Sequence, residues 1–252
     1  MFKYFKIKKK SKTIHDQLMK CSDHYRESYF LGKEEGMKQP IRTEVINYIL
    51  SRFTRETRYL EIGVRNPEDN FNHIKSDYKY SVDPGVEYAE NPVDFKMTSD
   101  SFFEQLSTDN ILSSEIRFDV IFIDGLHLAD QTDRDIKNSL NYLNPDGFVV
   151  IHDCNPPTEW HARENFSYSH TPATIAWNGT TWKAFVKWRS EPSLHSCCVD
   201  TEWGIGILSK VHSLGKSISN DNPFYEYEKF SENRNYYLNL VSHEQLKEIF
   251  NT

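Results

Sequence analysis

The sequence FDVIFIDGLH at residues 118–127 decides the fold of this chain, together with GFVVIHD at residues 147–153. Each segment is an apolar run that ends abruptly in acidic and imidazole side chains. A run such as residues 120–123 predicts a buried strand of a parallel sheet, and open α/β sheets bind ligands just past the carboxyl ends of such strands. The side chains that we expect to converge there are Asp124, His127, His152 and Asp153.

Carboxylate and imidazole groups are ligands that suit a divalent cation, so this cluster predicts metal-assisted chemistry. Asp124 and Asp153 are the predicted metal ligands. His152 is a candidate third ligand, or it packs against the strand end, because Mg²⁺ prefers oxygen. His127 is the predicted general base, since imidazole titrates near neutral pH and follows Asp124 by three residues; helix capping or support of the metal ligands is the alternative.

Predicted strands alternate with predicted helices along the chain. Strands are expected at residues 58–64, 78–82, 94–97, 118–124, 147–153, 196–200 and 204–209. Helices are expected at residues 43–53, 66–74, 101–106, 129–143, 181–189 and 238–250, with a long loop at 154–179. This alternation predicts an α/β fold with a doubly wound, mostly parallel seven-stranded sheet and helices on both faces.

The composition excludes several classes of protein. The 252 residues carry a formal net charge of −7, which fits one large domain and argues against nucleic acid as a partner. The first twelve residues hold six lysines, so residues 1–35 are predicted as a basic tail or a loosely docked helix, with weak contact to an anionic membrane surface as the alternative. Neither a spanning apolar run nor a signal peptide is evident, and a cytoplasmic location is expected.

Two strand ends point to an adenosine-containing cofactor. In YLEIGV, residues 59–64, Gly63 permits the tight turn through which backbone amides approach a ligand. About twenty residues later Asp83 ends the second strand, where a carboxylate is suited to accept hydrogen bonds from two ribose hydroxyls.

These residues resemble the class I S-adenosylmethionine-dependent methyltransferases over roughly residues 40–210. The resemblance implies cofactor-binding roles for Glu61, Gly63, Asp83, Ser99, Asp100 and Asp124. Residues 123–127 (IDGLH) and 151–153 (IHD) are further similar to the metal-dependent sugar O-methyltransferases of the macrocin O-methyltransferase type. In that group, a metal and a base surround a sugar hydroxyl, which implies S-adenosyl-L-methionine and Mg²⁺ or another divalent cation as cofactors.

The resemblance also implies a division of the chain. Residues 36–215 form the methyltransferase domain, and residues 216–252 form an aromatic, partly helical extension that could pack within the chain or form a homodimer face. The aromatic segment at residues 177–183 is a candidate surface for stacking on a sugar, although Trp182, Phe185 and Trp188, at helical spacing, are expected to lie in the core.

One departure from the family bears on the cofactor. Gly63 is followed by Val, Arg, Asn and Pro, whereas the family's loop has two or three glycines. A dinucleotide needs the fuller glycine fingerprint around its pyrophosphate, so the loop favours S-adenosylmethionine over NAD. The alternatives are a small phenol or catechol as acceptor, an NAD-dependent oxidoreductase or epimerase, and a noncatalytic scaffold.

Overall fold

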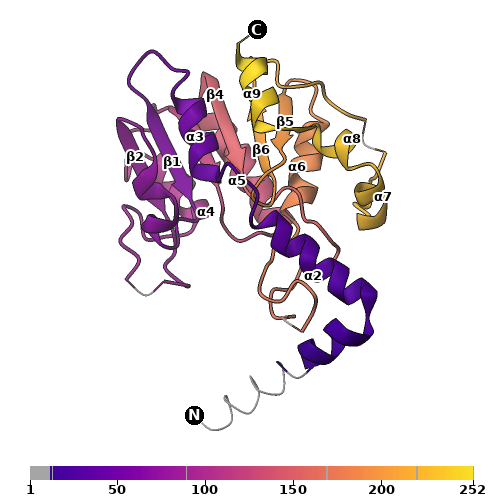
Figure 1. Cartoon of the computed structure of the whole chain (residues 1–252). Helices are drawn as coiled ribbons and strands as arrows, with labels where there is room; N and C mark the ends of the chain where they lie inside the picture. The colour runs from indigo at the N-terminus through magenta and orange to yellow at the C-terminus, as the bar shows by residue number, and fades with distance from the viewer. Residues whose placement is uncertain (1–11, 13, 89, 169, 220, 252) are drawn as a thin grey trace.

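The computed structural model describes residue 12 and residues 14–251, except 89, 169 and 220. A single sheet of seven strands organises this part of the chain, in the spatial order β2-β1-β3-β4-β6-β5-β7 (Figure 1). The strands are β1 (Arg58–Ile62), β2 (Tyr78–Val82), β3 (Phe118–Ile123), β4 (Leu143–Ile151), β5 (His195–Val199), β6 (Ile205–Ser209) and β7 (Leu240–Val241). Only β6 runs antiparallel to its neighbours, so the predicted mostly parallel seven-stranded sheet is confirmed.

Helices cover both faces of the sheet. On one face α3 (Arg42–Leu50) and α9 (His243–Phe250) form an apolar core together with Val120 and Phe122 of β3. On the other face α4 (Ser99–Ser107), α5 (Ala129–Tyr142) and α6 (Thr181–Arg189) form a second core together with Ile121 and Ile123. Because successive residues of a strand point to opposite faces, the apolar run of β3 supplies both layers at once. Trp182 and Phe185 are buried, as expected.

Three predicted elements were wrong in part. Residues 94–97 are not a strand; they contribute one isolated bridge, between Phe95 and Val82. The helix expected at 66–74 is two short 3₁₀ turns, Pro67–Asp69 and Phe71–His73. The helix expected at 238–250 is divided into the end of α8 (Arg234–Leu238), then β7 and α9, because Asn239 adopts a left-handed backbone that ends α8.

The carboxyl-terminal segment packs largely within the described chain. The short helix α7 (Tyr227–Glu232) places Phe230 in the core, where its ring stacks on Trp182 at 4.2 Å between centroids. Of the four cysteines, Cys154, Cys197 and Cys198 are buried as free thiols, and Cys21 is exposed.

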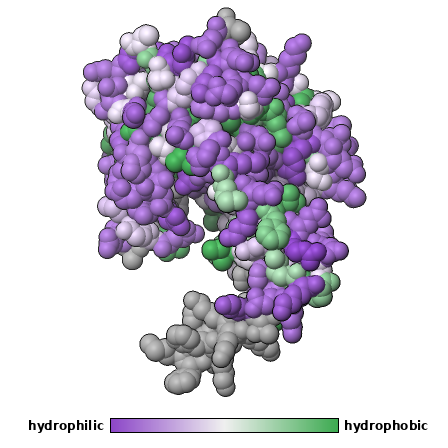
Figure 2. Space-filling model, viewed as in Figure 1, coloured by the Kyte–Doolittle hydropathy of each residue, from purple (hydrophilic) through white to green (hydrophobic). Residues whose placement is uncertain are grey.

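The amino-terminal region contributes helix α2 (Asp23–Glu35), with Tyr25, Ser28, Gly32 and Glu35 on its buried face. Phe30 and Leu31 remain exposed, and Figure 2 shows hydrophobic residues along and beside this helix on an otherwise largely hydrophilic surface. The lysine-rich residues 1–11 lie outside the described part, so membrane-surface contact stays a prediction. No helix in the described ranges is long and apolar enough to cross a membrane. The division at residues 35 and 215, the oligomeric state and the cytoplasmic location also stay predictions.

Candidate active site

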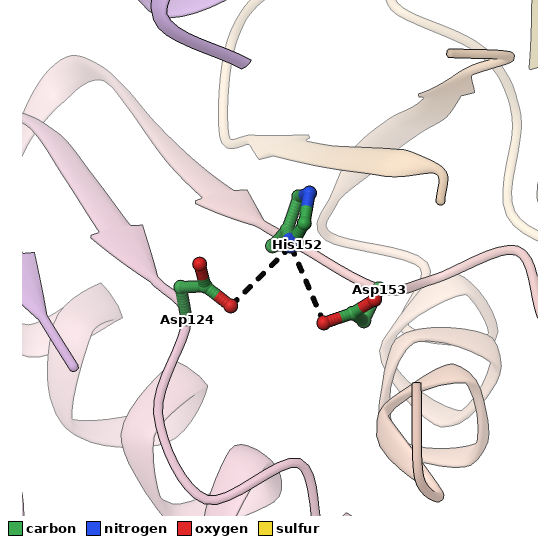
Figure 3. Close-up of side chains that lie close together, drawn as sticks. All are labelled: Asp124, His152 and Asp153. Atoms are coloured by element: carbon green, nitrogen blue, oxygen red, sulfur yellow. Dashed lines mark ion pairs between the residues drawn. The ribbon is translucent and has the colours of Figure 1, made fainter. Parts of the chain in front are cut away.

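The ends of β3 and β4 create the centre of the site. The two strands pair in parallel with Ile123 opposite Ile151, and the His152 N–H donates to the Ile123 carbonyl at 3.0 Å. Asp124 therefore leaves β3 beside the point where His152 and Asp153 leave β4. One ligand atom from each of these three residues lies within 4.8 Å of the others, and Figure 3 shows the two carboxylates facing each other beside the imidazole.

His152 lies between the two carboxylates. Its Nδ1 is 3.3 Å from Asp124 Oδ1 and 3.2 Å from Asp153 Oδ2 (Figure 3). Burial lowers the pKa of His152, but both carboxylates outweigh that effect and raise the pKa to about 10. Both ring nitrogens are buried, and neither has a hydrogen bond of good geometry to any residue that the structure describes.

These three residues fit a divalent cation. They supply two carboxylates and one imidazole at one point, and the buried imidazole nitrogens lack hydrogen-bond partners that a metal would replace. Burial would raise the pKa of Asp124, yet His152, His127 and Arg42 hold it well below its ordinary value. This lowering favours the ionised form of Asp124, which metal ligation requires.

His127 completes the cluster from the loop after β3, where its backbone is left-handed with φ +52°. Its Nε2 is 3.2 Å from Asp124 Oδ1, and its Nδ1 is 2.9 Å from the Trp177 carbonyl oxygen and 3.3 Å from Asp153 Oδ2. Burial lowers the pKa of His127, but Asp153 and Asp124 outweigh burial and raise it to about 9. The structure therefore brings together all four residues that the sequence placed in one site.

The long loop at 154–179 returns to this cluster. The Trp177 ring stacks on His127 at 5.3 Å and makes a tilted contact with Phe166 at 5.4 Å between centroids, so one face of the ring is occupied by His127. Stacking of this segment on a sugar stays a prediction. Asn178, which sequence reasoning missed, is fully buried and donates from Nδ2 to Asp153 Oδ1 at 2.8 Å.

Arg42 and Glu202 were also missed. Arg42 begins α3, and its Nη1 donates to Glu202 Oε1 at 2.8 Å while its Nε lies 3.9 Å from Asp124 Oδ2. Burial lowers the pKa of Arg42, but Asp124 and Glu202 outweigh it and raise that pKa further. Arg42 precedes the first strand and Glu202 follows the fifth, so no spacing in the sequence links either residue to Asp124.

Glu61 and Gly63 lie at the end of β1. The Glu61 carboxylate is buried and accepts from Tyr59 Oη at 2.6 Å and Asn70 Nδ2 at 2.9 Å. Burial raises the pKa of Glu61 to about 7 against these hydrogen bonds. Gly63 has φ +86°, and a Cβ there would lie 2.2 Å from the Asp124 carbonyl oxygen, so the close approach of β1 to β3 requires glycine.

Asp83 lies next to Gly63, because the Gly63 N–H donates to the Val82 carbonyl at 2.9 Å. Its two carboxylate oxygens accept from the backbone N–H groups of Arg65 and Gly85, at 2.9 and 2.6 Å, and Oδ1 also accepts from Asn91 Nδ2 at 3.4 Å. A carboxylate offers about four acceptor positions, so Asp83 keeps capacity for a ribose hydroxyl, mainly at Oδ2. Its surroundings fit the cofactor-binding role, which stays a prediction.

Ser99 and Asp100 begin α4 and face α5 rather than the metal cluster. Gln131 Nε2 donates to Ser99 Oγ at 3.1 Å and to Asp100 Oδ1 at 3.2 Å. Arg134 also pairs with Asp100, whose carboxylate is half exposed. Contact of these two residues with the cofactor also stays a prediction.

Comparison with known proteins bears on the class of enzyme. Residues 43–154 match the model of a family described as a methyltransferase domain. The match runs from the second residue of α3 to the residue after Asp153, and it includes every predicted site residue. No curated protein matches the sequence significantly.

Solved structures with similar folds include the O-methyltransferase from Bacillus cereus in complex with SAH. It is 13% identical, the alignment covers 78% of this chain and 95% of that chain, and the TM-score is 0.43. The SAH-bound methyltransferase from Podospora anserina is 14% identical, with 80% and 95% of the two chains covered and a TM-score of 0.42.

Strands β1 to β4 and the cluster at the ends of β3 and β4 lie within the stretch that matches the family model. Residues 43–154 are thus similar to a methyltransferase domain, in agreement with the predicted enzyme class.

Proposed function

We propose that the protein is a metal-dependent O-methyltransferase that moves a methyl group from S-adenosyl-L-methionine to a hydroxyl of a sugar or sugar-containing intermediate. The observation that carries this proposal is the cluster of Asp124, His152 and Asp153, with His127 against it, at the end of two strands of a methyltransferase domain.

The methyl donor would bind over the ends of β1 and β2. Asp83 would accept hydrogen bonds from the ribose hydroxyls, and the tight turn at Gly63 brings that part of the site next to Asp124. Ser99 and Asp100 would contact the adenine, as the family resemblance implies. Gly63 is the only glycine in the loop that follows β1, and a glycine-poor loop suits a cofactor without a pyrophosphate.

Asp124, Asp153 and His152 would hold a divalent cation, with Mg²⁺ favoured by the two carboxylates. When bound, the cation orients the acceptor hydroxyl and lowers its pKa. Asp124 would also lie beside the reacting methyl group, because it is the first residue after β3 and contacts the Gly63 turn.

His127 would remove the proton from the acceptor hydroxyl. A carbonyl oxygen can only accept, so Nδ1 carries the hydrogen that points to the Trp177 carbonyl. Nε2 lies 3.2 Å from Asp124 Oδ1, a carboxylate oxygen that can also only accept, so Nε2 carries a hydrogen while it contacts Asp124. A cation bound by Asp124 would compete with this contact and leave Nε2 as the basic nitrogen on the side of the metal ligands. The carboxylates that raise the pKa of His127 are also ligands of the cation, so a bound cation would oppose their effect.

The experiment that tests this proposal is calorimetric titration of the protein with S-adenosylmethionine and with NAD, each with and without Mg²⁺. Binding of S-adenosylmethionine but not NAD supports the donor. Methyl transfer to sugar acceptors, lost in EDTA and restored by Mg²⁺, would then support the acceptor class and the metal. Transfer to catechols alone would exclude the sugar.

A further inference from the structure

Asn178 touches the proposed metal site from the far side of the loop at 154–179. Its side chain is fully buried, and its Nδ2 donates to Asp153 Oδ1 at 2.8 Å and to the Trp203 carbonyl at 3.3 Å. Both partners are acceptors, so the amide group must present its nitrogen to them. The contact is therefore a hydrogen bond that Asn178 gives to the Asp153 carboxylate.

This hydrogen bond determines which oxygen of Asp153 faces the other ligands. Oδ1 is occupied by Asn178, whereas Oδ2 lies 3.2 Å from His152 Nδ1 and 3.3 Å from His127 Nδ1. Asp153 also has a left-handed backbone, with φ +61°, which places its side chain outside the regular path of β4. The carboxylate thus depends on a partner from another part of the chain for its orientation.

The segment around Asn178 is held rigidly against the cluster. The N–H groups of Asn178 and Gly179 both donate to the His161 carbonyl at 3.1 Å, and the Thr180 N–H donates to the His127 carbonyl at 2.8 Å. Gly179 has φ +60°, and a Cβ there would lie 2.1 Å from the His127 carbonyl oxygen. A side chain on this segment can therefore hold its partner in one position.

The oxygen of the Asn178 side-chain amide lowers the stability of the fold. This atom, Oδ1, is buried and has no hydrogen-bond partner among the described residues. A buried polar atom without a partner destabilises a fold, so the amide is poorly explained as a packing residue alone. Its effect on Asp153 offers a better explanation.

We propose that Asn178 is a positioning residue of the metal site, which turns one oxygen of Asp153 toward Asp124 and His152 and so strengthens binding of a divalent cation. This inference rests on the proposed function, because it assumes that these residues bind the cation. Hydrogen bonds to metal ligands typically change metal affinity by about 10–100-fold.

The test uses the full chain and Mn²⁺ as a spectroscopic probe. Free Mn²⁺ is measured by electron paramagnetic resonance during titration of the wild type and of Asn178→Leu, which has a similar size but no donor. We expect Asn178→Leu to weaken Mn²⁺ binding about 10–100-fold while affinity for S-adenosylmethionine changes less than about threefold.

Asn155→Leu is the matched control. Asn155 is equally buried, and its backbone N–H donates to the same Trp203 carbonyl at 2.8 Å, but its side chain pairs with Asp200 and Arg234 rather than with a metal ligand. It should lower thermal stability without weakening Mn²⁺ binding. If Asn178→Leu does not fold, Asn178→Ala takes its place.

The outcomes separate the two proposals. Unchanged Mn²⁺ affinity in the Asn178 variant, or an equal loss in the Asn155 control, overturns the positioning role and leaves the metal site standing. A wild-type protein that binds no Mn²⁺, with or without S-adenosylmethionine, overturns both the metal site and the role of Asn178.

Discussion

Replacement of Gly63 by alanine should destabilise the protein by about 2–4 kcal/mol. An L-residue with a left-handed backbone costs about 1–2 kcal/mol, and Gly63 has φ +86°. The new Cβ would also lie 2.2 Å from the Asp124 carbonyl oxygen, so the ends of β1 and β3 must separate. That movement weakens hydrogen bonds such as Asp124 N–H to the Ile62 carbonyl, now 2.9 Å, each worth about 0.5–1.5 kcal/mol.

A smaller effect acts in the opposite direction, because alanine restricts the unfolded chain and returns about 0.4–1 kcal/mol. The net loss should appear in urea unfolding as a lower midpoint with an unchanged slope. Since Asp124 must move, binding of Mn²⁺ and S-adenosylmethionine should weaken together. The contact between Gly63 and the Asp124 carbonyl therefore affects the binding of both ligands, because it joins the ends of β1 and β3.

Gly125→Ala is the control, since it changes the neighbour of Asp124 by the same methyl group. A Cβ at Gly125 would meet only Ile62 Cγ2, at 3.9 Å, and its backbone is not left-handed. We expect a change within about 0.5 kcal/mol, as for an uncrowded substitution. If Gly63→Ala unfolds at the same urea concentration as Gly125→Ala or the wild type, the reasoning from the strand contact is wrong.

Three further predictions concern individual side chains. Asp124→Ala and Asp153→Ala should abolish Mg²⁺-dependent methyl transfer but largely keep the affinity for S-adenosylmethionine. Asp83→Ala should instead weaken S-adenosylmethionine binding. An equal loss of S-adenosylmethionine affinity in all three variants, measured by calorimetry, would contradict separate metal and donor sites. His127→Ala should bind donor and metal yet lose about 10²–10⁴-fold in turnover, and a near-normal rate in a radiolabelled-methyl assay would remove it as the base. Glu61 is protonated more readily in the fold, with a pKa of about 7 against an ordinary 4.5, so its contribution to stability is full below pH 4.5 and is lost as pH rises through 7. Relative to Glu61→Gln, the wild type should therefore lose roughly 2–3 kcal/mol of unfolding free energy between those pH values, and parallel stability curves for the two proteins would refute this.

The sequence alone determined the inner strands of the sheet and the centre of the site. A run of four apolar residues precedes Asp124 and another precedes His152, and such runs are typical of inner strands that are buried on both faces. Parallel strands end at the same edge, so the residues after them had to approach each other. This information is local, since it depends on residues next to one another in the chain.

Local patterns also failed where tertiary contacts decide the conformation. Residues 94–97 alternate as a strand does, yet they lie beyond the edge of β2 and form one bridge there. Asn239 ends α8 at the second residue of the expected helix 238–250, and the chain then forms β7, which pairs with β5. The conformation of each segment depends on which strand of the sheet lies next to it. The spacing of apolar residues in the sequence does not contain this information.

Only the tertiary structure revealed what surrounds the metal ligands. Arg42 reaches Asp124 from a helix before the first strand, Glu202 reaches Arg42 from the turn between β5 and β6, and Asn178 reaches Asp153 from the long loop. Such contacts join residues that are 25 to 160 positions apart in the sequence, and these separations show no periodicity. The chain order of strands and helices determines which ligands meet, whereas the packing of loops against them decides how each ligand is oriented.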